Sequence, residues 1–186
     1  MPVPEDARDL PGVNDAFERL WTPHRMAYIT GERPDPAGGD GCPFCASPGR
    51  SDADGLIVHR GELCYVVLNL FPYNPGHLLV CPYRHVSRYV DLSDEETTEF
   101  TALTKAAVLA LEAASGPMGF NLGMNQGAVA GAGVAAHLHQ HVVPRWGGDA
   151  NFLPIIGRTK ALPQLLEDTR QRLVDHWPAG GSAPQA

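Results

Sequence analysis

The chain of 186 residues is 44% hydrophobic and 19% charged, and its formal net charge is −7. This length and composition predict one globular domain, with extensions, that buries a core without disulfide support. The net negative charge excludes a broad nucleic-acid surface but leaves room for a local cationic pocket that binds a small phosphorylated ligand. The sequence has no apolar run long enough to span a bilayer, and its acidic N-terminus does not resemble a secretion signal. We therefore expect a cytoplasmic protein without a membrane partner.

Hydrophobic periodicity and turn residues divide the chain into helices and strands. Ser93, followed three residues later by Glu96, forms a capping-box pattern that opens the most regular predicted helix. The predicted elements are a helix over 14–29, a connection over 31–54, strands over 56–58, 64–70 and 77–82, a helix over 93–114, a strand over 119–125, a loop over 126–133, a strand over 137–144 and a helix over 160–177. The first three strands predict an antiparallel meander. The predicted fold class is α+β, an antiparallel β-sheet with helices mainly on one face.

Three histidines occupy alternate positions of the strand predicted over 137–144, namely His137, His139 and His141. Because successive side chains of a strand point to opposite faces, we expect the three imidazoles to share one face. Imidazole serves as nucleophile, proton carrier or metal ligand near neutral pH, so this face indicates a reaction centre or a metal site. One interpretation is a metal-dependent enzyme whose three histidines bind a catalytic ion, although no nearby carboxylate completes such a site.

The segment His137–Val143 resembles the motif of the histidine triad family, in which three alternating histidines are followed by two apolar residues. Residues 67–72 and 75–80 resemble the nucleotide-binding strand, loop and following strand of that family. The resemblance covers residues 42–149 and implies a histidine-triad-like sheet. It divides the chain into an N-terminal helix with a flexible connection (1–41), a histidine triad catalytic domain (42–150) and a C-terminal extension with a helix (151–186).

Three flanking segments resemble the actinobacterial branch of this family, whose members phosphorolyse diadenosine tetraphosphate. These segments are residues 20–23, 73–76 and 146–152. The resemblance implies a nucleotidyltransferase that converts diadenosine tetraphosphate and inorganic phosphate to ADP and ATP, with no cofactor required for catalysis. The close alternative is a hydrolase that releases AMP from dinucleoside polyphosphates or nucleoside phosphoramidates. Family relatives are dimers or larger, so the resemblance also implies a homo-oligomer, either a dimer or a tetramer.

The resemblance assigns a catalytic role to each histidine of the triad. His139 would attack the α-phosphorus of an adenine nucleotide and hold the nucleoside monophosphate covalently. This chemistry suits imidazole, because a neutral ring nitrogen is a good nucleophile and the phosphoramidate that it forms is labile. His141 would contact the transferred phosphoryl group or carry a proton, and His137 would support the cluster from one side.

The same resemblance assigns the nucleoside to the end of an upstream strand. Asn69 matches the residue that bonds ribose hydroxyls, and Leu70 and Phe71 would flank the base. The alternative for Leu70 and Phe71 is a place in the core, because apolar residues that end a strand are often buried.

Phosphate contacts are predicted on the other side of the triad. Asn125 matches an amide that contacts phosphate in the family, and Gly133 and Val134 occupy positions where relatives often carry a hydroxyl or amide side chain. The loop over 127–133 can offer backbone N–H groups to an anion. Together with Arg145 and Asn125, these groups are the available donors for inorganic phosphate. Arg145 lies on the face of the triad only if the strand stays regular past Pro144, and the alternative is that it points to solvent.

Cys42 and Cys45 have the spacing of a zinc knuckle, but two ligands do not complete a site. The resemblance implies that His85 and His137 complete a Cys-Cys-His-His tetrahedron around a structural zinc ion, which would order the connection over 31–54. The alternative is a pair of reduced cysteines without a metal. The other two cysteines, at positions 64 and 81, lie in apolar runs and are expected in the core, and His77 is expected only to begin a strand.

Overall fold

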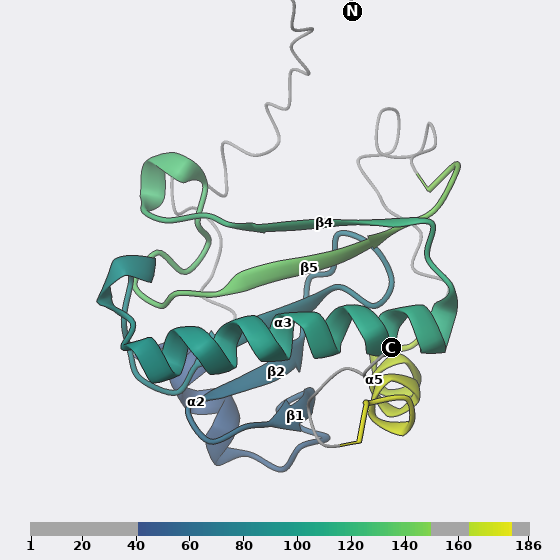
Figure 1. Ribbon diagram of the computed structural model, residues 1–186, viewed down its shortest axis with the longest axis horizontal. Coiled ribbons are helices and arrows are strands. Elements are labelled where there is room, and N and C mark those ends of the chain that lie inside the picture. The colour runs from purple at the N-terminus through teal and green to yellow at the C-terminus, as the bar shows by residue number, and fades with distance from the viewer. Residues whose placement is uncertain (1–40, 150–163, 180–186) are drawn as a thin grey trace, which may run out of the picture.

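The computed structural model of the protein describes residues 41–149 and 164–179 (Figure 1). The predicted helix over 14–29 and the first residues of the predicted helix over 160–177 lie outside the described residues. Among the helices of the described ranges, none has both the length and the apolar character needed to cross a membrane.

Five antiparallel strands form one open sheet in the order β1-β2-β3-β5-β4. The strands are β1 (Ile57–Arg60), β2 (Cys64–Leu68), β3 (Leu78–Pro82), β4 (Gly119–Met124) and β5 (Gln140–Arg145). The first three strands are neighbours in chain order, which confirms the predicted meander. β5 lies between β3 and β4, so the last strand of the described residues is inserted next to the edge strand β4. The predicted α+β class is confirmed.

The long helix α3 (Asp94–Ser115) covers one face of this sheet (Figure 1). The predicted capping box is present, because the Ser93 hydroxyl accepts from the Glu96 N–H and the Glu96 carboxylate accepts from the Ser93 N–H. The helix ends at Gly116, whose φ of 55° is a left-handed conformation that glycine adopts without steric cost. Its apolar stripe packs on the sheet in the main core, which includes Val66, Leu68, Leu78, Val80, Phe100, Leu103, Ala107, Leu111 and Val142.

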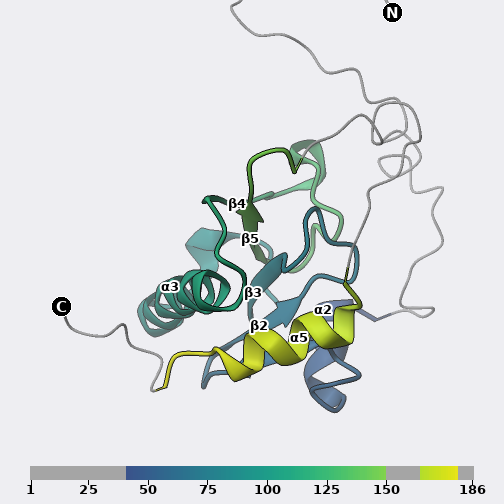
Figure 2. The same ribbon diagram turned by 90° about the vertical axis from the view of Figure 1, so that its right-hand side faces the viewer.

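The opposite face of the sheet carries a smaller apolar cluster. Figure 2 shows α3 on one side of the sheet and the short helix α2 (Pro43–Ala46) on the other. Phe44 of α2 packs against this cluster, which consists of Ile57, Tyr65, Val67, Leu79 and Cys81. Cys64 lies in the main core, so the burial predicted for Cys64 and Cys81 is confirmed.

Two segments predicted as irregular contain short helices. Within the predicted connection over 31–54, residues 43–49 form α2 and the 3-10 helix η3 (Ser47–Gly49). A proline in the first turn favours this helix, and the N–H groups of Cys45 and Ala46 both bond to the Cys42 carbonyl. A second 3-10 helix, η5 (Ala128–Ala130), interrupts the predicted glycine-rich loop. A third, η4 (Tyr89–Asp91), precedes α3.

The C-terminal helix α5 (Leu166–Asp175) is shorter than the predicted helix over 160–177 and packs beside β1 and α3. Its Leu173 is buried in the main core. Arg170 reaches the segment before β1, where its Nε donates to the carbonyls of Asp52 (2.9 Å) and Ile57 (2.8 Å). Helix α5 is therefore an integral part of this side of the domain.

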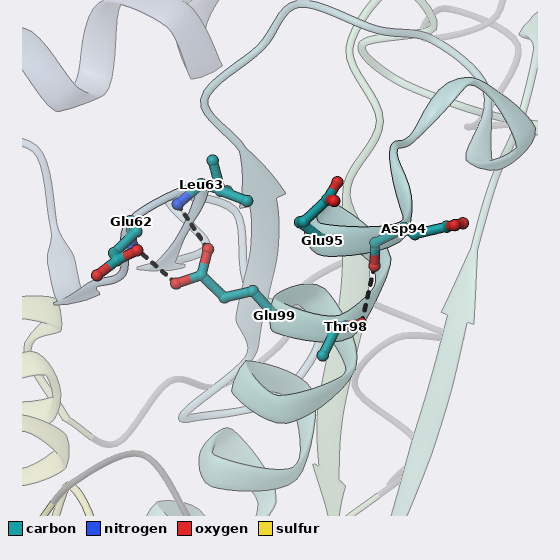
Figure 3. Close-up of a pocket in the computed structure, with 6 residues that line it drawn as sticks. All are labelled: Glu62, Leu63, Asp94, Glu95, Thr98 and Glu99. Carbon is teal, nitrogen blue, oxygen red and sulfur yellow. Dashed lines mark hydrogen bonds between the residues drawn. The ribbon is translucent and has the colours of Figure 1, made fainter.

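Glu99 of α3 fixes the turn between β1 and β2. Its carboxylate accepts hydrogen bonds from the backbone N–H groups of Glu62 (2.7 Å), Leu63 (2.6 Å) and Cys64 (2.9 Å). Figure 3 shows this carboxylate at the wall of a pocket whose lining contains four acidic residues: Glu62, Asp94, Glu95 and Glu99. Such a lining does not suit an anionic nucleotide, so we assign Glu99 a structural role.

We predict that Glu99→Gln lowers the free energy of unfolding by about 1–3 kcal/mol, because the amide offers one acceptor oxygen and turns an NH2 group toward a backbone donor. The measurement is urea unfolding followed by circular dichroism. The matched control is Glu112→Gln, an exposed position of the same helix. Equal stability of the two variants would contradict the structural role of Glu99.

Candidate active site and metal site

The three histidines of the triad lie where the β3–β5 ladder ends. The sequence predicts all three in one strand, but β5 begins at Gln140, so only His141 is a strand residue. The ladder stops at the pair Val80 and Gln140, and the N–H of Leu138 instead donates to the carbonyl of Val86 (2.6 Å). The last residue of β3 is a proline, which has no N–H to extend the ladder.

The imidazoles nevertheless lie on one side of the sheet. His141 pairs with Leu79, so it lies on the face opposite to α3. The rings of His139 and His141 are 5.0 Å apart and nearly perpendicular. The ring of Phe44 contacts two members of the triad, with ring centroids 4.8 Å from His139 and 5.6 Å from His137. The predicted grouping of the triad is therefore present, although a regular strand supplies only part of it.

His139 is buried, and its hydrogen bonding assigns its tautomer. Its Nδ1 lies 2.9 Å from the His137 carbonyl oxygen, which can only accept, so Nδ1 carries the proton. The lone pair of the neutral ring is then on Nε2. Burial lowers the pKa of His139 from its ordinary value, against the opposing effect of this hydrogen bond. The site therefore contains an uncharged imidazole with a nucleophilic nitrogen.

A fourth histidine, His77, belongs to this cluster and was not predicted there. Its Nδ1 accepts from the backbone N–H of Tyr73 (3.0 Å) and lies 3.2 Å from the Asn69 amide nitrogen. The proton of a neutral His77 is therefore on Nε2, which donates to Nδ1 of His141 (2.9 Å). The signal for this role is positional: His77 precedes Leu79 by two residues, so it lies on the same face as His141 once β3 and β5 are paired.

His141 presents a buried donor to the site. Because its Nδ1 accepts from His77, its own proton is on Nε2, and this buried nitrogen has no hydrogen-bond partner among the described residues. Burial, aided by the neighbouring His139, lowers the pKa of His141 to about 4. This buried N–H group can donate a hydrogen bond to an oxygen atom of a bound ligand. A phosphoryl oxygen next to His139 would be such an acceptor.

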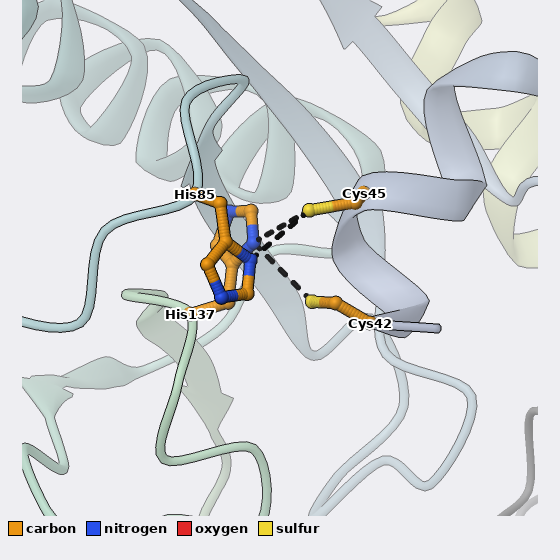
Figure 4. A group of neighbouring side chains, drawn as sticks. All are labelled: Cys42, Cys45, His85 and His137. Atoms are coloured by element: carbon orange, nitrogen blue, oxygen red, sulfur yellow. Dashed lines mark hydrogen bonds between the residues drawn. The ribbon is translucent and has the colours of Figure 1, made fainter. Parts of the chain in front are cut away.

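The four predicted metal ligands lie together at the edge of the triad (Figure 4). The Nδ1 of His137 lies 3.3 Å from Sγ of Cys42 and 3.4 Å from Sγ of Cys45, and the Nδ1 of His85 lies 3.2 Å from Sγ of Cys45. A tetrahedral zinc ion with Zn–S near ~2.3 Å and Zn–N near ~2.0 Å separates sulfur and nitrogen by about 3.5 Å. The donor set therefore fits a zinc ion.

The outer nitrogen of His137 supports this fit. Its Nε2 lies 2.9 Å from the Pro82 carbonyl and donates to it, which leaves the lone pair of Nδ1 directed at the two sulfur atoms. Metal-binding histidines commonly use their second nitrogen in this way. The carbonyl that accepts this bond belongs to the proline at the end of β3, so the triad, the sheet and the four candidate metal ligands meet at one point.

The predicted nucleoside contacts lie in the loop after β2. Asn69 is half-buried, and its Oδ1 accepts from the N–H of Phe71 (3.0 Å). Leu70 and Phe71 are 53% and 56% exposed, so neither is a core residue. This removes the alternative of a core position, and their contact with a base stays a prediction.

Of the predicted phosphate contacts, Asn125 is located by the pairing of β4 with β5. Met124 pairs with Gln140, so the half-buried Asn125 follows β4 at the level of His139. Gly133 is exposed and Val134 is partly exposed. Their contacts with phosphate stay predictions.

Arg145 is hydrogen-bonded to other side chains of the protein. Its Nε and one terminal nitrogen donate to the two carboxylate oxygens of Asp149 (2.6 and 2.9 Å), and its other terminal nitrogen donates to Asn121 (2.7 Å). The carboxylate of Asp149 also accepts from the amide of Asn74 (2.8 Å). We therefore assign Arg145 to the anchor of the 71–77 loop rather than to the binding of phosphate.

Comparison with known proteins identifies the class to which this site belongs. The family model of the HIT domain matches residues 50–148. The chain therefore belongs to the histidine triad (HIT) family, as its motifs predict. Among the curated proteins, the AP-4-A phosphorylase of Mycobacterium tuberculosis (strain H37Rv) is 51% identical over 170 residues, which cover 89% of this chain and 87% of that protein.

Solved structures agree with this family. A hypothetical histidine triad nucleotide-binding protein from Sulfolobus tokodaii strain 7 has a TM-score of 0.61 and 28% identity, and the match covers 73% of this chain and 91% of that one. A zinc-bound histidine triad family protein from Mycobacterium smegmatis has a TM-score of 0.60 and 26% identity, with coverage of 73% and 92%.

The hydrogen bonds of the histidine cluster make a spectroscopic prediction. In nitrogen-15 correlation spectra at pH 7, we expect His139 to carry its proton on Nδ1, and His77 and His141 to carry theirs on Nε2. His141 should stay neutral until the pH falls to about 4. In His77→Phe the donor to Nδ1 of His141 is lost, so the His141 signals should shift toward a mixture of tautomers.

The control is His176→Asn, at an exposed position that follows α5, which should leave these signals unchanged. A wild-type His141 that carries its proton on Nδ1 would contradict the assigned direction of the His77–His141 hydrogen bond.

Proposed function

We propose that this protein is a nucleotidyltransferase that phosphorolyses diadenosine tetraphosphate to ADP and ATP through a covalent nucleotide on His139. The 51% identity to a protein named AP-4-A phosphorylase over 89% of the chain is the observation that carries the choice of substrate. The arrangement of the histidines supports the choice of nucleophile, because the lone pair of the neutral His139 ring is on Nε2 and its neighbour His141 offers a buried donor.

The reaction proceeds in two steps, formation of the covalent nucleotide on His139 and its transfer to phosphate. In the first, Nε2 of His139 attacks the α-phosphorus of one adenosine, the bond to the bridging oxygen breaks, and ATP leaves. In the second, an oxygen of inorganic phosphate attacks the same phosphorus, the bond to His139 breaks, and ADP leaves. The Nε2–H of His141 donates to the phosphoryl oxygens in both steps, where it stabilises charge without itself being consumed.

The other predicted contacts complete this proposal. Asn69 bonds the ribose, Leu70 and Phe71 flank the base, and the backbone of the loop around Gly133 and Val134 offers N–H groups to the polyphosphate. With Arg145 paired to Asp149, Asn125 and these N–H groups are the donors that we assign to the acceptor phosphate.

We also propose that a structural zinc ion is bound by Cys42, Cys45, His85 and His137. The ion would hold α2 against the sheet and thereby keep Phe44 against the ring of His139. The assignment of residues 42–150 as the catalytic domain, the cytoplasmic location and the homo-oligomer stay predictions.

Product analysis with labelled inorganic phosphate tests the function. We expect the label in the β-phosphate of ADP, unlabelled ATP in equal amount, and a rate that rises with phosphate concentration. Without phosphate, mass spectrometry should detect an AMP adduct on His139. His139→Asn should lower turnover at least about 10⁴-fold, because the whole two-step route is lost.

The matched control is His176→Asn, which should turn over like the wild type. AMP and ATP formed at a rate independent of phosphate would make the protein a hydrolase and would exclude phosphorolysis. Wild-type turnover by His139→Asn would exclude the covalent nucleotide.

Zinc should copurify at about one ion per chain, with X-ray absorption distances near ~2.3 Å to sulfur and ~2.0 Å to nitrogen. Cys42→Ser and Cys45→Ser should each lose the metal, whereas Cys64→Ala, outside the cluster, should retain it. Chelation should speed hydrogen exchange of residues 42–49. The absence of metal from protein purified without chelator, or a metal bound by His139 and His141, would refute the assignment.

A further inference from the structure

Tyr73 contacts both members of the His77–His141 pair. Its ring is stacked on the imidazole of His141, with centroids 5.5 Å apart and planes 20° apart. The same ring lies 4.6 Å from the ring of His77. Its backbone N–H is the group that donates to Nδ1 of His77 (3.0 Å). Tyr73 therefore touches the pair through its main chain and its side chain independently.

The loop that carries Tyr73 is held at both ends. On one side, the amide of Asn74 donates to the carbonyl of Pro144 (3.0 Å) and to Asp149 (2.8 Å). On the other, Gly76 has a φ of 81°, and a Cβ there would lie 2.9 Å from a methyl group of Leu111. Because these anchors do not involve the ring of Tyr73, a substitution of the ring should leave the backbone N–H in place.

The ring of Tyr73 limits a tilt of the His141 imidazole that the hydrogen bond from His77 does not prevent. A single bond from His77 to Nδ1 fixes one point of the imidazole but permits the ring to tilt about that point. The edge contact with His139 and the face contact with Tyr73 bound this tilt on two sides. With the plane fixed, the Nε2–H of His141 keeps one direction, and a donor held in place needs no reorganisation when a charged group arrives.

We propose that Tyr73 is a positioning residue that holds the imidazole plane of His141, so that its Nε2–H meets the phosphoryl group of a nucleotide at His139. The inference rests on the proposed function of the triad. The ring, rather than the hydroxyl group, performs the role, because the contacts to His77 and His141 are ring contacts.

The experiment compares Tyr73→Phe with Tyr73→Leu in the full chain. We measure single-turnover formation of the AMP adduct from diadenosine tetraphosphate, KM, thermal unfolding, and the nitrogen-15 signals of His141. The Tyr73→Phe variant keeps the ring, so its rate of adduct formation should lie within about twofold of the wild-type rate. Leu should lower the rate about 10- to 100-fold, as misplacement of a catalytic group does, while KM changes less than about threefold. The melting temperature should change little, and the His141 signals should broaden or shift toward a mixture of tautomers.

The matched control is Tyr89→Leu, because the ring of Tyr89 contacts Phe100 instead of a histidine. An equal loss in Tyr73→Phe would assign the role to the hydroxyl group and overturn the proposal, as would a Tyr73→Leu variant with wild-type rate and His141 signals. Should Tyr73→Leu fail to fold, Tyr73→Met supplies the same test.

The outcomes for the proposed function are distinguishable from those for Tyr73. If the wild type releases AMP independently of phosphate, phosphorolysis fails, but adduct formation still measures the role of Tyr73. If the wild type forms no adduct, the proposed function fails. The His141 signals of the two variants then decide whether the ring holds the imidazole.

Discussion

The antiparallel pairing of β3 with β5 is the contact on which the site depends. It places His141 opposite Leu79, and thereby brings His77 within 2.9 Å of a residue 64 positions further along the chain. The ladder is stable because its other face is buried under α3, where Leu78, Val80 and Val142 enter the main core. The point where the ladder ends is equally important, because His137 and His139 lie in the irregular segment just before the first residue of β5, Gln140.

Around this ladder, main-chain groups fix the state of each imidazole. The carbonyl of His137 orients His139, the carbonyl of Pro82 orients His137, and the N–H of Tyr73 orients His77. Main-chain groups are rigid partners, so each ring presents a defined nitrogen to the site. Burial lowers the pKa of each triad histidine, which keeps the cluster uncharged near neutral pH although three imidazoles stand together.

Two arginines, Arg60 of β1 and Arg170 of α5, fix the segment that links the proposed metal ligands to β1. Arg60 donates to Asp52 and to the carbonyls of Pro48 and Arg50, and Arg170 of α5 donates to the carbonyls of Asp52 and Ile57. These contacts secure the segment that follows the two cysteines. Phe44 lies between the two cysteines and contacts His139, so the proposed zinc ion and the proposed nucleophile share one neighbour.

The meander, the capped helix α3 and the grouping of the triad follow from local patterns in the sequence, because period-two and period-3.6 spacing and a capping box involve residues that are near one another in the chain. The family follows from the motif at His137–Val143. The resemblance to the family also predicted the four residues whose ligand atoms lie close together at the candidate metal site: Cys42, Cys45, His85 and His137. Three features are seen only in the folded chain: β5 begins at Gln140, Arg145 is paired with Asp149, and His77 bonds to His141. Each of these depends on the register of strands or on contacts between residues distant in the chain, and one sequence without its fold does not specify those partners.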